Sequence, residues 1–237
     1  MKNQLIFKQK TMEGFQNFNT NFDPNTLANQ TSDVIQFVVV LDKSGSVDSF
    51  KDVMNTALRD VFMVELKNSH RKNDIVIKCI EFNNRVEHKS GFMPILNLPD
   101  DYLELKNPSG TTALYDAVLE ALQHVQQYRD DLEDQGVNVR TCVFICTDGE
   151  DNASNFKSAQ EIRNIVDNLR KKEVGSFNIN VLGVGTESIF RQSCIDMGLN
   201  PDKCLSTVGA TAKEIRAQMG VVSQSVSSSS NTTTITF

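Results

Sequence analysis

Long hydrophobic runs are missing from this sequence of 237 residues. The longest uninterrupted apolar stretches, such as Phe37 to Leu41, are far shorter than the ~18–20 residues of a membrane-spanning helix. The apolar segment Leu5-Ile6-Phe7 near the start is likewise shorter than the ~7–15 residues of a secretory signal. We therefore expect a cytoplasmic protein with no signal peptide and no membrane span.

Paired cysteines and clustered histidines are missing as well. The five cysteines are odd in number, widely spaced and free of any C-x-x-C pattern, which argues against a disulfide framework. They are Cys79, Cys142, Cys146, Cys194 and Cys204. Only the last two lie in a loop-rich stretch, and a reducing compartment would keep them as thiols. The histidines are scattered and offer no zinc ligand set: His70, His88 and His124.

The sequence has no excess of positive charge. Its 24 basic and 30 acidic side chains give a formal net charge of −6, so nucleic acid and anionic membrane surfaces are poor partners. The acidic excess has two readings, a solvated acidic surface or carboxylates gathered around a metal ion. An apolar content of 39% supports a folded core, and the length fits one α/β domain with extensions or two small domains.

The motifs of three enzyme classes are absent. Haloacid-dehalogenase-like phosphatases carry a D-x-D motif after the first strand. Here the residue two positions after Asp42 is Ser44, so the second carboxylate of that motif is missing. No G-x-S-x-G motif of a serine hydrolase is present. The segment Gly183-Val184-Gly185-Thr186 lacks both the third glycine of G-x-G-x-x-G and the lysine of a P-loop. With no visible base or nucleophile, binding is favoured over catalysis.

What the sequence does contain is an alternation of strand-like and helix-like apolar patterns. Strand-like runs cover residues 34–41, 75–82, 85–92, 139–146, 177–184 and 203–207. Apolar stripes of helical period cover residues 50–62, 114–125, 159–169, 189–197 and 215–222. The run at 34–41 is apolar except for Gln36 and is rich in β-branched residues, which is typical of a strand buried on both faces of a parallel sheet.

This order predicts a doubly wound, Rossmann-like α/β fold with a mostly parallel sheet and helices on both faces. Asn83-Asn84 suits a tight hairpin turn, so we expect the run at 85–92 to be one antiparallel edge strand. The predicted domain spans residues 34–226. A polar extension precedes it at 1–33, and a Ser/Thr-rich flexible tail follows at 227–237, within a polar stretch that begins at Ser223.

Three oxygen-rich loops follow the predicted strands or precede a helix. The first strand ends in Asp42, with Ser44 and Ser46 at a spacing of two. The strand at 139–146 is followed by Thr147, Asp148 and Gly149, and Ser109 to Thr112 opens a helix between them. Sites in doubly wound sheets form at the carboxyl ends of strands, so we expect these loops to meet.

These motifs resemble the von Willebrand factor A (vWA) family and its metal-ion-dependent adhesion site, called MIDAS. The resemblance covers residues 34–226, and D-x-S-x-S falls on Asp42, Ser44 and Ser46. The family's threonine matches best at Thr112, with Thr111 as the fallback, and its T-D-G aspartate matches Asp148. Two carboxylates and three hydroxyls form an all-oxygen set that suits Mg²⁺ or Mn²⁺ and is poor for Zn²⁺.

The resemblance also implies what the site does. In the family the hydroxyls bind the ion directly and the aspartates act through water, so the ion accepts a Glu or Asp from a partner protein. We therefore predict a protein-binding module rather than an enzyme. The alternative is a metal-dependent phosphate-handling enzyme that uses the same residues. The family also implies that its last helix, here Ile215 to Val226, shifts when the site rearranges.

Within the family the chain is most similar to intracellular, TerY-like members of tellurium-resistance operons. That resemblance implies a role in chemical stress or phage defence, with a kinase, phosphatase or AAA-type ATPase as partner. Among residues near the motifs, Lys43 is expected to point to water. The alternatives are that it softens the negative field of the site or contacts the partner's carboxylate. Glu150 and Asp151 are expected to cap the segment before the next helix, or else to lie behind the metal ligands.

Overall fold

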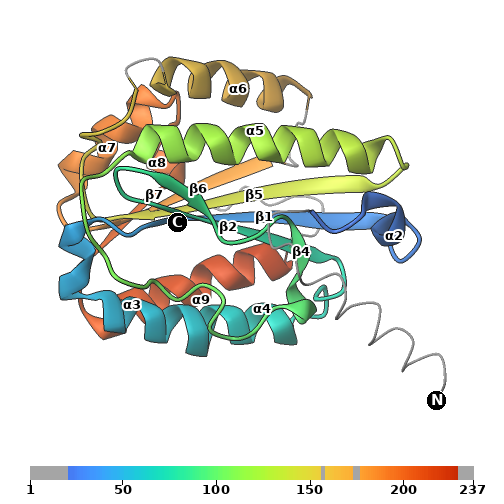
Figure 1. Ribbon diagram of the computed structural model, residues 1–237, viewed down its shortest axis with the longest axis horizontal. Helices are drawn as coiled ribbons and strands as arrows, with labels where there is room; N and C mark the ends of the chain where they lie inside the picture. Colours follow the sequence, from blue (N-terminus) through green and yellow to red (C-terminus); the bar gives the residue numbers. More distant parts are fainter. Residues whose placement is uncertain (1–20, 156–157, 173–176, 229–237) are drawn as a thin grey trace.

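The computed structural model describes residues 21–155, 158–172 and 177–228. They form a seven-stranded, mostly parallel sheet with helices on both faces, which confirms the predicted fold class (Figure 1). The strand order is β3-β2-β1-β5-β6-β7, and β4 also pairs with β2. The strands are β1 (Asp33–Asp42), β2 (Ile75–Phe82), β3 (Val86–His88), β4 (Met93–Pro94), β5 (Asn138–Thr147), β6 (Phe177–Val184) and β7 (Leu205–Val208).

The helices cover the sheet in two layers. Figure 1 shows α5, α6, α7 and α8 on one face and α3, α4 and α9 on the other. Their bounds are α2 (Pro24–Ala28), α3 (Lys51–Ala57), α4 (Val64–Asn68), α5 (Leu114–Glu133), α6 (Ser158–Lys172), α7 (Glu187–Asp196), α8 (Pro201–Cys204) and α9 (Ala212–Ser228). Shorter helical turns are η1 (Gly45–Ser49), η2 (Leu58–Met63) and η3 (Ile95–Asn97).

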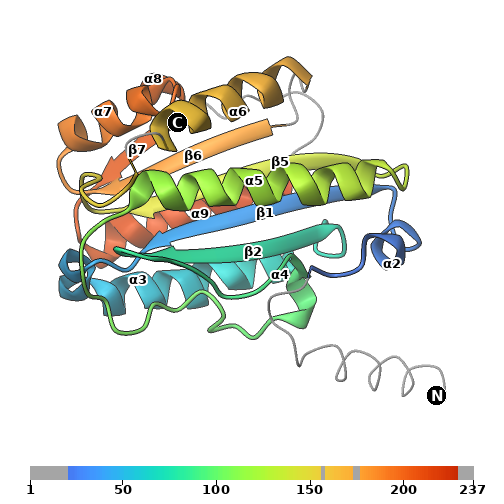
Figure 2. The ribbon, with the colours of Figure 1, turned by 45° about the horizontal axis from the view of Figure 1, so that its top comes forward.

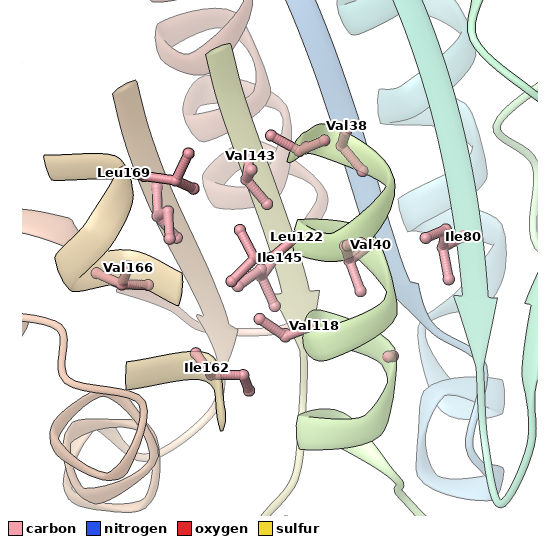
Figure 3. Close-up of a cluster of buried hydrophobic side chains, with 14 of the residues drawn as sticks. Val38, Val40, Ile80, Val118, Leu122, Val143, Ile145, Ile162, Val166 and Leu169 are labelled. Atoms are coloured by element: carbon pink, nitrogen blue, oxygen red, sulfur yellow. The ribbon is translucent and has the colours of Figure 1, made fainter. Parts of the chain in front are cut away.

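The central strand β1 is buried on both faces because alternate side chains enter different cores. Val38 and Val40 pack in the layer beneath α5 and α6, as Figure 3 shows. Phe37 and Val39 point to the opposite layer, which includes side chains of α3, η2 and α9. A strand with a core on each side has no polar face, which explains the continuous apolar run in the sequence.

The antiparallel edge is present, but the run at 85–92 does not form one continuous strand. β3 pairs with β2 through His88 opposite Ile80, and β4 resumes with Met93 opposite Ile77. The chain thus advances five positions from His88 to Met93 while its partner advances three. The two extra residues form a bulge, which divides the predicted strand into two short ones.

The helix predicted at 50–62 contains an irregular turn. The apolar stripe is continuous, yet the backbone changes at Leu58 from α-helix to the wider π-helix of η2 before α4 begins. Phe62 on this turn is fully buried between Phe37 and Phe144, with ring centroids 5.6 and 5.9 Å away. The aromatic contacts therefore connect η2 to the two central strands.

Both ends of the described chain are packed more closely than a loose extension would be. Leu27 of α2 is buried, and the Phe22 amide donates to the Phe92 carbonyl at 2.7 Å. At the other end, α9 continues to Ser228, and Ser223 is buried with its hydroxyl donating to the Glu65 carboxylate. The polar stretch from Ser223 thus starts as helix, while residues 1–20 and 229–237 lie outside the described ones.

Within the described residues, no helix is both long and apolar enough to span a membrane. The parallel strands β1 and β5 lie side by side and end at the same edge of the sheet, where α5 begins (Figure 2). This edge carries the three oxygen-rich loops.

Candidate metal centre

Backbone hydrogen bonds hold the first two loops of the site together. The amide of Gly45 donates to the carbonyl of Gly110 at 3.1 Å, and the amide of Ser109 donates to the carbonyl of Lys43 at 2.9 Å. A Cβ atom added at Gly45 would lie 3.6 Å from that same Gly110 carbonyl oxygen. The loop after β1 and the loop before α5 therefore lie directly against each other.

A continuous chain of oxygen atoms links the D-x-S-x-S loop to the loop after β5. The hydroxyls of Ser44 and Ser46 lie 3.1 Å apart, and the Ser46 hydroxyl donates to Asp148 Oδ1 at 2.9 Å. Asp42 is fixed from both sides, since its Oδ1 accepts the Ser44 amide at 2.7 Å and its Oδ2 accepts the Thr147 hydroxyl at 2.6 Å. The structure thus brings four of the five predicted ligands together.

The fifth predicted ligand, Thr112, lies next to the loop that follows β5. It is buried, whereas Thr111 is exposed. A Cβ atom at Gly149 would lie 3.7 Å from Thr112 Oγ1, so this hydroxyl faces the loop that carries Asp148. The geometry favours Thr112 over Thr111 as the threonine of the site.

Among the described residues, the two carboxylates have no positively charged partner. Burial raises the pKa of Asp42, and burial together with the charge of Asp42 raises the pKa of Asp148 to about 6. The ion pairs among the described residues include neither aspartate. A divalent cation would relieve this repulsion, and an oxygen-only donor set fits a hard ion such as Mg²⁺ or Mn²⁺.

Lys43 does not point to water as expected. Its side chain is 10% exposed, and its ammonium lies 2.5 Å from Glu87 Oε2 and 3.7 Å from Glu81 Oε2. Lys89 also pairs with Glu81, at 2.6 Å. Lys43 is therefore directed to β2 and β3, and it connects the loop after β1 to the edge of the sheet.

Asp151 contacts both the segment before α6 and the start of α5. Its Oδ1 accepts the hydroxyl of Ser154 at 2.5 Å and the amide of Tyr115, in the first turn of α5, at 3.2 Å. Asn152, which belongs to none of the sequence motifs, accepts the backbone amide of Thr112 through its side-chain oxygen at 2.8 Å. The free amides at the start of a helix can donate to side chains from any nearby loop, so the order of residues in the sequence does not show which helix a side chain caps.

The histidines are less scattered than predicted. The rings of His88 and His124 stack with centroids 4.7 Å apart, and His88 Nε2 lies 2.8 Å from Glu120 Oε2. Stacked rings present their faces to each other rather than their nitrogen lone pairs. Across the described ranges, no group of three His, Cys, Asp or Glu residues is arranged to hold a metal.

Two substitutions test which threonine belongs to the site. We expect Thr112→Val, which removes the hydroxyl and keeps the side-chain shape, to weaken Mn²⁺ binding by about tenfold or more. Even groups that only orient a metal ligand contribute ~10–100-fold to affinity, so loss of a direct ligand should cost at least as much. Thr111→Val is the matched control and should bind Mn²⁺ like the unsubstituted chain. Titration calorimetry measures both. A loss confined to Thr111→Val would assign the ligand to Thr111 instead.

The fold of the chain is similar to that of several proteins of known structure. No family model and no curated protein matches the chain. Solved structures do: the pilus adhesin SpaC of Lactobacillus rhamnosus GG matches with a TM-score of 0.62 at 12% identity, over 89% of this chain and 31% of its own. The conserved hypothetical protein BatB of Bacteroides thetaiotaomicron has a TM-score of 0.52 at 15% identity, over 81% of this chain and 97% of its own.

A third similar protein is proximal thread matrix protein 1 (PTMP1) of the mussel byssus. It has a TM-score of 0.56 at 18% identity, over 82% of this chain and 46% of its own. Another PTMP1 structure is described with a zinc-occupied MIDAS motif, at a TM-score of 0.55 and 16% identity. The chain thus spans about a third of the adhesin and about half of PTMP1. These matches and the strand order give the chain a vWA-like α/β fold.

Proposed function

We propose that the chain is a protein-binding module that engages an acidic residue of a partner through Mg²⁺ or Mn²⁺. The ion would be held by Asp42, Ser44, Ser46, Thr112 and Asp148. One observation carries this proposal: the hydrogen bond from Ser46 to Asp148 joins loops 102 residues apart in sequence. That bond places hydroxyls and carboxylates around one point with no cationic side chain paired to either aspartate among the described ion pairs.

The donor set explains why a carboxylate would be the incoming ligand. Three hydroxyls are neutral, and the vWA resemblance implies that the two aspartates act through water. An ion with neutral direct ligands keeps most of its charge toward an open position, which an acidic side chain then fills. The 20-residue helix α5 begins two residues after Thr112, so the positive end of its dipole adds to this field.

The similar structures support a binding role, because the set includes an adhesin and a matrix protein. The rest of the proposal rests on the sequence: a cytoplasmic location, a role in chemical stress or phage defence, and a kinase, phosphatase or AAA-type ATPase partner. The five cysteines are free and buried in the structure, and the sulfur atoms of Cys194 and Cys204 lie 3.9 Å apart. The shift of α9 also stays a prediction from the family resemblance.

Affinity capture under two metal conditions tests the function. The chain is immobilised and exposed to native lysate with Mg²⁺ or with EDTA. We expect a partner that is retained only with Mg²⁺, is lost with Asp148→Ala, and is lost again when one acidic residue of that partner becomes alanine. Retention that is indifferent to EDTA and to Asp148 would contradict a metal-mediated contact.

The same preparation tests the enzymatic alternative. A binding module should hydrolyse nucleotides and phosphoesters no faster with Mg²⁺ than its Asp42→Ala variant does. Turnover that requires both Mg²⁺ and Asp42 would favour the phosphate-handling enzyme. The two experiments use one protein sample, so a misfolded preparation is recognised by its melting curve before either is interpreted.

A further inference from the structure

We propose that residues 151–154 form a clamp that positions Thr112, and that Asn152 is its main positioning residue for the metal ion. This inference rests on the proposed function, because it concerns the same site. It adds a group of residues outside the five-ligand set. Three groups of hydrogen bonds carry it.

Asn152 holds both backbone polar groups of Thr112. The backbone amide of Thr112 donates to the side-chain oxygen Oδ1 of Asn152 at 2.8 Å. The backbone carbonyl of Thr112 accepts the backbone amide of Asn152 at 2.9 Å. The amide of Ala153 donates to the same carbonyl at 3.1 Å. The backbone of the threonine is therefore fixed by the loop that follows β5, and its hydroxyl is aimed as a consequence.

The same segment caps helix α5 from outside. The residue before the helix, Ala113, makes no side-chain cap, so the first amides of α5 need other acceptors. Asp151 accepts the Tyr115 amide at 3.2 Å, and the Ser154 hydroxyl accepts the Asp116 amide at 3.0 Å. A cap supplied by another loop fixes the start of α5 relative to that loop.

Asp116 of α5 in turn accepts hydrogen bonds from the segment that leads to α6. Its carboxylate accepts the Asn155 amide at 3.1 Å and also the hydroxyl of Ser158 at the start of α6. The loop carrying Asp148 and the helix following Thr112 are thus bonded reciprocally. We infer that the two loops keep one relative position, which a metal site with strict ligand geometry requires.

Asn152 acts as a positioning residue and not as a ligand. Its side-chain oxygen accepts the Thr112 amide, and the residue is exposed. Because it is exposed, its replacement opens no cavity in the core. A loss of metal affinity would then come from displaced Thr112 rather than from a general loss of folding.

Calorimetric titration with MnCl₂ tests the clamp on the full chain. We expect Asn152→Ala to bind Mn²⁺ about 10–100-fold more weakly, the range seen when a group that orients a metal ligand is removed. Asn152→Asp keeps the acceptor oxygen and should bind at least as tightly as the unsubstituted chain. Asn168→Ala, at an exposed asparagine of α6, is the control and should leave affinity unchanged.

Hydrogen exchange of the Thr112 amide gives a readout that does not depend on metal. Its protection should fall in Asn152→Ala and be kept in Asn152→Asp, with nearly the same melting temperature for both. If the unsubstituted chain and Asn152→Ala bind Mn²⁺ equally well, the clamp inference is overturned and the metal site stands. If the unsubstituted chain binds no Mn²⁺, the proposed function is overturned and the affinity role of Asn152 with it.

Discussion

Mg²⁺ or Mn²⁺ should raise the melting temperature of the unsubstituted protein, and replacing Asp148 with alanine should abolish this increase. An ion present at ~100 times its dissociation constant stabilises a folded protein by about 2.7 kcal/mol. For a chain of this size that corresponds to an increase of roughly 5–10 °C. Asp148 accepts the Ser46 hydroxyl at 2.9 Å and is one of only two carboxylates in the site, so its removal takes away half of the negative charge that would hold the ion.

Thermal melts with MnCl₂ and with EDTA measure this effect. Asp131→Ala is the matched control, because it removes the same charge from an exposed position at the far end of α5. In EDTA, Asp148→Ala should be at least as stable as the unsubstituted protein, since burial and Asp42 disfavour the charge at this position. A metal-induced shift that survives in Asp148→Ala would remove this aspartate from the site.

Replacing Phe62 with alanine should destabilise the protein by about 3–5 kcal/mol, the range for removing a large aromatic side chain from a core. Phe62 is fully buried and stacks against Phe144 of β5 while also contacting Phe37 of β1. Few side chains can fill the space, because its neighbours belong to the two central strands. A lowered midpoint of urea unfolding, with an unchanged dependence on urea concentration, measures the loss.

Val64→Ala is the control for this substitution. Val64 follows η2 directly and is 40% exposed, so its truncation should change stability by no more than about 0.5 kcal/mol. A loss below about 1 kcal/mol for Phe62→Ala would mean that η2 moves inward to fill the cavity. The π-helical turn would then be adaptable rather than fixed by the aromatic contacts.

The sequence predicted those parts of the fold whose signal is local. The continuous apolar run of β1 and the stripe of α5 each follow from side chains a few positions apart, and both elements lie where predicted. The bulge between β3 and β4 could not be predicted, because it is defined by pairing with β2. The π turn at Leu58 was also invisible, since the apolar stripe runs through it without a break.

The candidate site shows the same division. The spacing of Asp42, Ser44 and Ser46 and the position of Asp148 after a strand are local signals, and the structure brings these residues together. The choice of Thr112 over Thr111 depends on which hydroxyl faces Gly149. The direction of Lys43 depends on Glu81 and Glu87, which belong to other strands. Contacts between segments far apart in sequence decide such details.

The wide separation of the site loops along the chain also bears on how the protein matures. Ser46 and Asp148 are 102 positions apart in sequence. They follow β1 and β5, which pair in parallel and are connected by a long crossover. Such contacts form slowly, because distant segments must meet before any of them is stabilised. A nascent or clipped chain that ends before β5 would carry the whole D-x-S-x-S loop but would lack Asp148, one of the five proposed ligands. Recognition through this site would therefore distinguish a completed molecule from an unfinished one.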